Sequence, residues 1–328
     1  MLETGWKVVN FDKLTYAGDA QFSAQFKTDP RYKFFVSDIA DTHDVEEVFA
    51  AVKPDVVVNF AAESHVDRSI LDAAPFITTN VTGVQVLLDA CRRHKVERFL
   101  QVSTDEVYGD VEGKSASDEG APLNPSSPYA ASKAAADLLV LAYRRTYGLP
   151  VAIVRSSNNY GPMQFPEKLL PLVIRNVLDN LPIPVYGDGG QQRDWLYVED
   201  HCAGILKALQ SAADGSVVNL GTGIQRSNLD VVRQLCRCVA RRRGSAADAA
   251  LALIHHVTDR PGHDRKYAVK TEKAAKELGW TPVTSFSEGI ERTVDWYLGN
   301  ETWLRRKTSG GFKDYYRAVY ENAWKKEP

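Results

Sequence analysis

A repeated alternation of apolar runs and amphipathic stretches over residues 1–155 constrains the fold more than any other feature of the chain. The run Asp55–Phe60 is almost continuously apolar, as expected for a parallel strand buried on both faces. Arg98–Ser103 and Val151–Arg155 have the same character. Parallel neighbours need a crossover, usually a helix, between them. The pattern therefore predicts an α/β fold with a doubly wound parallel sheet.

Helices are expected between these strands. Apolar residues recur at helical spacing over 45–52, after the capping candidates Asp41 and Thr42. Further helices are predicted near Val81–Cys91 and from about Pro128 to Tyr147.

Beyond residue 155 this rhythm loosens, and loops rich in Gly, Pro and Asn separate shorter elements. We therefore expect a first domain over 1–155 and a smaller α/β region over 156–328. The formal net charge of -2 indicates neither a nucleic-acid nor a membrane partner. No apolar run approaches the roughly 20 residues that span a bilayer, and no secretory signal is recognised at the start.

The four cysteines favour a reduced, cytoplasmic protein. Cys91 and Cys202 lie in apolar helical patterns and are expected to be core thiols. Cys236 and Cys238 form a single C-x-C without a second ligand pair nearby, so we expect no metal site there.

The front of the chain is unusual for a dinucleotide-binding sheet. Such sheets begin with a strand, a glycine-rich turn and a helix, and their second strand ends on an acid that binds the adenosine ribose. Lys7–Asp12 fits that second strand, and Leu2–Gly5 fits the tail of the preceding helix with Gly5 as its C-cap. No glycine-rich turn occurs near residue 1. Either the sequence is shortened at its start, which we favour, or the protein lacks the pyrophosphate cradle; both predict weak NAD binding.

Tyr129 and Lys133 form a Y-x-x-x-K pair near the start of a predicted helix. Residues four apart share one helix face, so the ammonium can lower the tyrosine pKa and make it a general base. The same spacing also occurs by chance, and the pair would then be an exposed tyrosine packed against the aliphatic part of the lysine side chain. Position favours the functional interpretation, because the pair follows a strand that ends at Ser103-Thr104, and ligands bind at the carboxyl ends of such strands.

Thr104-Asp105-Glu106 lies at the end of that same strand. A solvated turn would explain two adjacent carboxylates. The alternative is an acid and base pair, because like charges crowded in a dry cleft raise one carboxyl pKa and keep a proton available.

Six segments make the chain resemble the extended short-chain dehydrogenase/reductase superfamily and, within it, the dTDP-glucose 4,6-dehydratases. They span nearly the whole chain: Asp12–Gly18, Ala61–Ser69, Ser103–Gly109, Ser157–Pro162, Arg193–His201 and Asp259–Asp264. The absent glycine-rich start is the one large departure. The resemblance implies a Rossmann-type NAD-binding domain and a nucleotide-sugar-binding region.

The resemblance also implies a mechanism. Tyr129 would accept the C4 hydroxyl proton while hydride passes to NAD, and Lys133 would tune Tyr129 and hold the nicotinamide ribose. Glu106 would remove the C5 proton, and Asp105 would protonate the departing C6 hydroxyl. Thr104 would hold the C4 oxygen, and hydride would return to C6.

Further contacts are implied by position. The cofactor residues would be Asp12, Lys13, Thr15, Asp38, Ile39, Ala61, Ala62, Ser64, Thr79 and Asn159, together with Tyr129 and Lys133. The substrate residues would be Ser64, Thr104, Asn158, Lys168, Leu169, Pro184, Tyr186, Arg193, Asn228, Arg260 and His263. Arginines suit the diphosphate because a guanidinium grips phosphate oxygens bidentately.

Simpler roles stand beside three of these assignments. Asn228 would merely cap a helix over 229–239, Arg193 would pair with Asp194 on the surface, and His65 is expected to be a buried structural histidine.

Other functions share part of this pattern. A nucleotide-sugar 4-epimerase needs the tyrosine and lysine but not Asp105 and Glu106, and a GDP-mannose dehydratase usually has one carboxylate there. A UDP- or CDP-glucose 4,6-dehydratase and a pseudoenzyme without cofactor remain alternatives. The resemblance implies a homodimer formed by the helices near Val81–Cys91 and Ala134–Tyr147.

Overall fold

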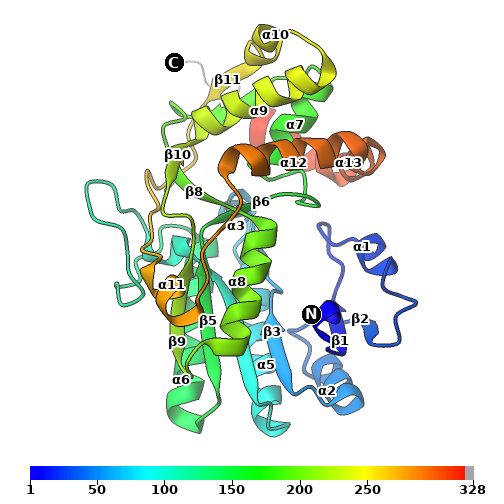
Figure 1. Cartoon of the computed structure of the whole chain (residues 1–328), viewed down its shortest axis with the longest axis vertical. Coiled ribbons are helices and arrows are strands. Elements are labelled where there is room, and N and C mark those ends of the chain that lie inside the picture. The colour runs from blue at the N-terminus through cyan, green and yellow to red at the C-terminus, as the bar shows by residue number, and fades with distance from the viewer. Residues whose placement is uncertain (322–328) are drawn as a thin grey trace. The chain divides into compact units, whose positions relative to one another are not determined.

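A computed structural model describes residues 1–321, which form two compact units interleaved along the sequence (Figure 1). Unit 1 comprises Met1–Val107, Ser127–Arg155 and Ile205–Val218. Unit 2 comprises Tyr108–Ser126, Ser156–Gly204 and the chain from Asn219 onward. Two contiguous domains with a boundary at residue 155 remain a prediction. Within the described residues, no helix combines the length and apolar character needed to span a membrane.

The main sheet has the strand order β3-β4-β5-β9. Its strands are β3 Val56–Asn59, β4 Arg98–Thr104, β5 Val151–Ser156 and β9 Ser216–Leu220. β3 runs parallel to β4, with Val56 opposite Arg98, and every residue of β5 is buried. The predicted α/β fold is confirmed, and the apolar runs are strands because each is covered on both faces.

Helices fill the intervals between these strands, as the periodicity predicts, and Figure 1 shows α5 and α6 beside β3, β4 and β5. The helical elements of unit 1 are η1 Leu2–Thr4, α1 Ala20–Ala24, α2 Thr42–Val52, α3 Val66–Leu71, α4 Ala74–Ile77, the π-helical turn η2 Thr78–Thr82, α5 Gly83–Arg93 and α6 Pro128–Tyr147. The predicted cap Asp41 accepts hydrogen bonds from the backbone N–H groups of His43 and Asp44. Apolar faces of α2, α5 and α6 meet those of β4 and β5 in one core that includes the buried thiol of Cys91.

The first two strands form a sheet of their own, with β1 (Val8–Asp12) parallel to β2 (Tyr32–Val36). Neither strand contains a fully buried residue, in contrast to β5. Gly5 adopts the left-handed conformation, with φ 86°, and its N–H donates to the Leu2 carbonyl, which confirms it as a C-cap. The interrupted front of the dinucleotide-binding sheet stays a prediction.

Unit 2 contains two small sheets, β10-β8-β6 and β11-β7. The strands are β6 Asn158–Tyr160, β7 Ile183–Tyr186, β8 Gln192–Tyr197, β10 Gln225–Ser227 and β11 Ile254–Val257. The helices are α7 Leu169–Leu178, α9 Asn228–Arg243, α10 Ala247–Leu251, α11 Glu272–Leu278, α12 Phe286–Gly299, α13 Glu301–Lys307, α14 Gly311–Tyr316 and the π-helical turn η4 Arg317–Glu321. α8 (Val198–Ser211) runs from unit 2 into unit 1.

Two sequence expectations are wrong. Cys202 is exposed, because it lies on a face of α8 that the core does not cover. The cap of α9 is Ser227, whose side chain accepts from the Asp230 N–H, so Asn228 is the first helical residue and does not cap the helix. His65 is buried as expected.

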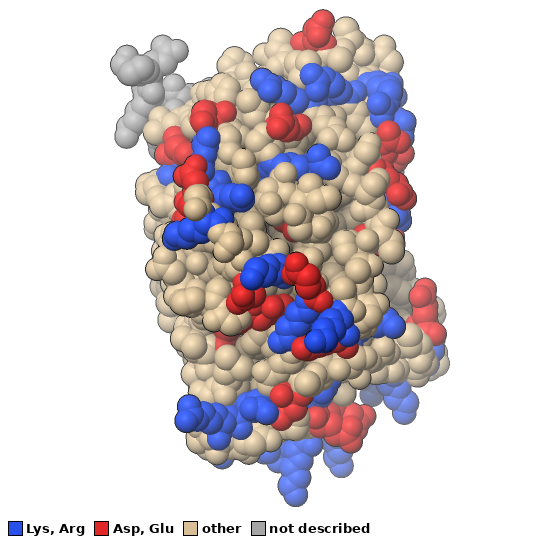
Figure 2. Space-filling view, turned by 60° about the vertical axis from the view of Figure 1, so that its left-hand side comes forward, with Lys and Arg blue, Asp and Glu red and all other residues tan. Residues whose placement is uncertain are grey.

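Charges of both signs are interspersed on the face shown in Figure 2, where blue Lys and Arg side chains lie next to red Asp and Glu. Arg241 and Arg242 of α9 pair with Glu291 and Asp295 of α12 in this manner. Over residues 1–321, no three His, Cys, Asp or Glu side chains come close enough together to hold a metal ion.

Candidate active site

The candidate acid and base directly follow strand β4. It ends at Thr104, and the chain turns at once into the 3-10 helix η3, Asp105–Tyr108. Thr104 and Asp105 are buried, and Glu106 is half-buried. The Glu106 N–H donates to Thr104 Oγ1 at 3.3 Å. Carboxylates on a solvated turn would be exposed, so the burial of Asp105 contradicts that simpler interpretation.

Helix α6 contains the candidate tyrosine and lysine. Ser127 caps it by accepting from the Ala130 N–H, and Pro128 occupies the first turn, where a missing N–H costs nothing. Tyr129 and Lys133 are both buried on one helix face. The Tyr129 ring packs edge-on against Phe76, with 6.3 Å between ring centroids. These two residues do not form a surface pair.

The structure brings these residues together in unit 1. Burial raises the pKa of Tyr129, and the negative charges of Glu106 and Asp105 raise it further, while a hydrogen bond with Thr104 lowers it. Thr104, Asp105 and Glu106 therefore lie near enough to Tyr129 to affect its pKa. A proton taken from a substrate hydroxyl is therefore held firmly by Tyr129 unless a cation offsets the carboxylates.

Lys133 is the buried cation nearest to the tyrosine in sequence. Its Nζ donates to the Val102 carbonyl of β4 at 2.7 Å. Burial lowers the pKa of Lys133 to about 8, and the Asp137 carboxylate opposes that effect. The ammonium is therefore largely protonated at neutral pH.

The predicted adenosine-binding residues lie together at the ends of β1 and β2. Asp12 Oδ1 accepts from the Leu14 N–H at 2.7 Å. Lys13 Nζ and Asp38 Oδ2 form an exposed ion pair of 2.9 Å. Thr15 follows in the same turn and accepts from the Gly18 N–H, and Ile39 is buried next to Asp38.

A loop after β3 carries the predicted residues Ala61 and Ala62, which are half-buried, and Ser64, which is exposed. The predicted Thr79 is buried in η2, next to a residue that the sequence analysis missed. This residue, Asn80, is 1% exposed, exchanges two hydrogen bonds of 2.9 Å with the Glu63 backbone and donates to Ser132 Oγ. Asn80 thus connects this loop to α6 through Ser132, which lies between Tyr129 and Lys133 in the sequence.

Unit 2 holds the predicted cofactor residue Asn159 and most of the predicted substrate residues, while the substrate residues Ser64 and Thr104 lie in unit 1. Asn158 and Asn159 lie on β6, Arg193 on β8 and Asn228 at the start of α9. The Oδ1 atoms of the three asparagines are buried and accept no hydrogen bond from the described residues. Buried acceptors are normally satisfied, so these three atoms are available for a ligand.

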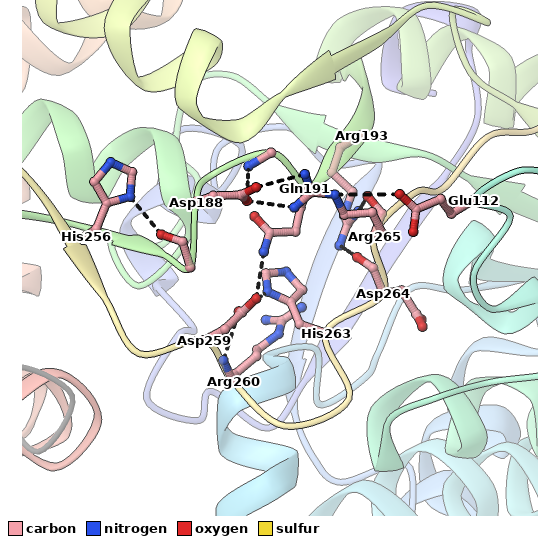
Figure 3. A network of polar contacts seen from close by, with 12 residues as sticks. Glu112, Asp188, Gln191, Arg193, His256, Asp259, Arg260, His263, Asp264 and Arg265 are labelled. Carbon is pink, nitrogen blue, oxygen red and sulfur yellow. Dashed lines mark hydrogen bonds and ion pairs between the residues drawn. The ribbon is translucent and has the colours of Figure 1, made fainter. Parts of the chain in front are cut away.

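A polar network around Asp259 joins several of these residues (Figure 3). The Asp259 carboxylate accepts from His263 Nδ1 at 2.6 Å, from the Arg260 N–H at 2.9 Å and from Gln191 Nε2 at 2.8 Å. Burial and the neighbouring Arg260 lower the pKa of His263 to about 4, so the imidazole is neutral near pH 7. Arg193 also acts on His263 electrostatically, which places both arginines near this ring.

Arg193 is not the surface ion pair that the simpler interpretation supposes. It is 4% exposed, its guanidinium donates to the Asp264 carbonyl at 2.8 Å, and it stacks 4.1 Å from the centre of the Tyr267 ring. Asp194 instead accepts from the Thr222 and Gly223 N–H groups. The guanidinium is thereby fixed in one orientation.

The remaining substrate residues lie around this network or on its flank. The Tyr186 ring at the end of β7 contacts the His263 ring, with 5.9 Å between centroids, and Pro184 lies on the same strand. Lys168 precedes α7 and Leu169 begins it. The structure therefore brings Tyr186, Arg193, Arg260 and His263 together, while Lys168 and Leu169 stand on a separate element.

Comparison with known proteins agrees with this site. A family model described as GDP-mannose 4,6 dehydratase matches residues 1–293. A dTDP-glucose 4,6-dehydratase of Neisseria meningitidis is 46% identical, over 93% of this chain and 90% of its own length. A dTDP-glucose 4,6-dehydratase of an Actinoplanes species is 48% identical, over 90% of this chain and 89% of its own length.

Solved structures give the same result. The dTDP-glucose 4,6-dehydratase DesIV of Streptomyces venezuelae, crystallised with NAD, is 42% identical, with a TM-score of 0.86 and coverage of 92% of this chain and 90% of that one. A UDP-glucose 4-epimerase of Thermus thermophilus is more distant, with 32% identity, a TM-score of 0.81 and coverage of 91% and 93%. This chain belongs to the dTDP-glucose 4,6-dehydratase family of extended short-chain dehydrogenases/reductases.

Proposed function

We propose that this chain catalyses the NAD-dependent dehydration of dTDP-glucose to the 4-keto-6-deoxy sugar. The observation that carries the proposal is the burial of Asp105 and Thr104 against Tyr129, with Glu106 acting on the same hydroxyl. An oxidation at C4 needs only the tyrosine and lysine. Loss of water needs a base and an acid in addition, and the two carboxyl groups supply them.

The residues fit an NAD cofactor at its nicotinamide end. Asn159 Oδ1 is buried and accepts no hydrogen bond from the described residues, so it can accept from a carboxamide. The Lys133 ammonium has donors beyond the one bonded to the Val102 carbonyl, and these suit ribose hydroxyls. When bound, NAD accepts a hydride from C4 and later returns it to C6.

Proton transfers by this chain balance the reaction. Tyr129 takes the proton of the C4 hydroxyl, while Thr104 donates a hydrogen bond to the same oxygen. The resulting ketone acidifies C5–H, and Glu106 removes that proton. Asp105 gives a proton to the C6 hydroxyl, which leaves as water. Glu106 returns its proton to C5 as hydride reaches C6. The proton that Tyr129 gained passes through solvent to Asp105, so that Tyr129, Asp105 and Glu106 all regain their starting states.

Unit 2 supplies the contacts for the nucleotide diphosphate. Arg193 and Arg260 offer guanidinium groups to phosphate oxygens. The neutral His263 adds no charge but offers ring nitrogens for hydrogen bonds, and Tyr186 provides an aromatic surface for the base. The unsatisfied oxygens of Asn158 and Asn228 can accept from N–H or hydroxyl groups.

A direct test incubates the purified protein with NAD and, separately, with dTDP-glucose, UDP-glucose and CDP-glucose. We expect the alkali-induced absorbance of a 4-keto sugar with dTDP-glucose and much less with the others. Formation of a 4-epimer without loss of water would identify an epimerase. No product from any of the three would refute the proposal.

A substitution at Glu106 tests whether this residue is the base that removes the C5 proton. Glu106→Gln should abolish exchange of the C5 hydrogen with deuterated solvent, because no base remains at that carbon. The matched control is Glu97→Gln, since Glu97 is exposed on the turn before β4. Retained exchange in Glu106→Gln would remove Glu106 from this role.

We also propose that the protein is a cytoplasmic homodimer, joined by α5 and α6. Leu138 in the middle of α6 is 60% exposed, and Tyr147 at its end is 51% exposed, which leaves apolar area for a second copy. Light scattering after size exclusion should give twice the mass of the chain, and Leu138→Asp should give the single mass. An unchanged mass in that variant would exclude this helix face, and cell fractionation tests the location.

A further inference from the structure

A buried ion pair lies directly behind the tyrosine and lysine of α6. Asp137 is 0% exposed and follows Lys133 by one helical turn, on the face that also carries Tyr129. Arg155 of β5 is 3% exposed, and its Nε donates to Asp137 Oδ2 at 2.8 Å. The roles proposed above use neither residue.

Such a pair needs a reason. Taking two charges out of water costs several kcal/mol per ion even after relaxation, and apolar side chains of similar volume are often equally stable or better. Perturbed buried charges concentrate at functional sites. Asp137 lies on the same helix face as two proposed catalytic groups, and this position indicates a role for the buried ion pair in the chemistry.

Charges alternate along this face of the site. Among the described residues, Asp137 is the charged group whose electrostatic interaction opposes the burial of Lys133, and it favours the protonated amine. Burial raises the pKa of Asp137, while the Arg155 guanidinium bonded to its carboxylate, and the charge of Lys133, oppose that effect and favour the ionised form. On Tyr129, Glu106 and Asp105 act more strongly than Asp137.

Helix geometry explains why Asp137 acts mainly on the lysine. A rise of 1.5 Å per residue puts Asp137 about 6 Å along the axis from Lys133 but about 12 Å from Tyr129. The attraction to the nearer ammonium is therefore about twice the repulsion of the farther phenolate, before any screening. The net effect of Asp137 is to preserve the cation beside Tyr129.

We propose that Asp137, held ionised by Arg155, is a positioning residue that keeps Lys133 protonated and so enables Tyr129 to act as the base. The inference rests on the proposed roles of Tyr129 and Lys133. It adds that the dehydration requires a complete buried chain of alternating charges: Arg155, Asp137, Lys133 and Tyr129.

The test measures the protonation of Lys133 without turnover, so that it stands apart from the test of the dehydratase activity. Protein labelled with carbon-13 at lysine Cε is titrated by NMR, and Lys133 is identified by the resonance that Lys133→Arg lacks. In Asp137→Asn, the midpoint should fall from about 8 by about one pH unit or more, as expected on loss of a nearby opposite charge. An unchanged midpoint would overturn the proposal.

Two further variants separate charge from structure. Asp194→Asn is the matched control, because Asp194 is equally buried but accepts only from neutral groups of Thr222 and Gly223. Its Lys133 midpoint should equal that of the unaltered protein, and a shift there would also overturn the proposal. Should Asp137→Asn not fold, Arg155→Lys carries the test, since it removes the Nε donor that bonds Asp137 Oδ2 but keeps a positive charge, and it predicts a smaller fall.

Where the enzyme turns over, kcat gives a second readout. The alkaline limb of its pH profile should move in Asp137→Asn to lower pH by the same amount as the NMR midpoint. Asp137→Glu, which restores the charge, should recover most of the original profile. A lower kcat with an unmoved profile would show a merely structural role and overturn the proposal.

Discussion

Replacement of Asn80 by Ala tests how the cofactor loop is held. The Asn80 amide makes three hydrogen bonds of 2.9 Å, two with the Glu63 backbone and one with Ser132 Oγ. Each such bond contributes about 1 kcal/mol net, and the partners left behind are themselves at least partly buried. Asn80→Ala should therefore lower the free energy of unfolding by about 3 kcal/mol.

The matched control is Asn10→Ala on β1, where the amide makes a single half-buried bond to the Tyr32 hydroxyl at 3.2 Å. That variant should lose about 1 kcal/mol or less. Urea denaturation with a fixed slope gives both values from the shift in midpoint.

Asn80→Ala should also raise the KM for NAD, because the loop with Ala61, Ala62 and Ser64 loses its tie to α6. Ser132→Ala and the double variant complete a cycle, and a coupling energy of about 1 kcal/mol is expected between the two side chains. A loss of stability no larger than that of Asn10→Ala, together with an unchanged KM, would refute this account of the loop.

Two more predictions follow from the structure. Gly187→Ala should weaken nucleotide-sugar binding, as measured by calorimetry. Gly187 has φ +55°, and an added Cβ would lie 2.9 Å from Asp259 Oδ2, in the carboxylate that bonds His263. An unchanged affinity would contradict the role of this network. Burial lowers the pKa of His201 to about 4 in the folded protein. As the pH falls from about 6.5, the histidine therefore takes up a proton in the unfolded chain before it does so in the folded one. The free energy of unfolding should decline towards pH 4 by up to about 3 kcal/mol. His201→Asn should flatten that slope in urea titrations at stepped pH, and an equal slope would count against the histidine.

The sequence predicted the alternation of strands and helices over residues 1–155 and the proposed catalytic residues. Short apolar runs without alternation, separated by helical patterns, indicate strands of a parallel sheet, so β3, β4 and β5 were predictable from local composition. The i, i+4 spacing placed Tyr129 and Lys133 on one face of α6, and the end of β4 fixed Thr104 to Glu106. These are short-range properties, since the residues that specify them lie within one strand or one helical turn.

Tertiary structure decided the partners of those residues. Asn80 and Ser132 lie 52 positions apart, and Asp137 and Arg155 lie 18 apart, so no local pattern marks either pair. The same holds for Asp259 with Gln191, and for the exposure of Cys202 on the amphipathic helix α8. A local sequence pattern specifies which face of an element is apolar, but only packing determines which buried polar groups must meet to satisfy one another.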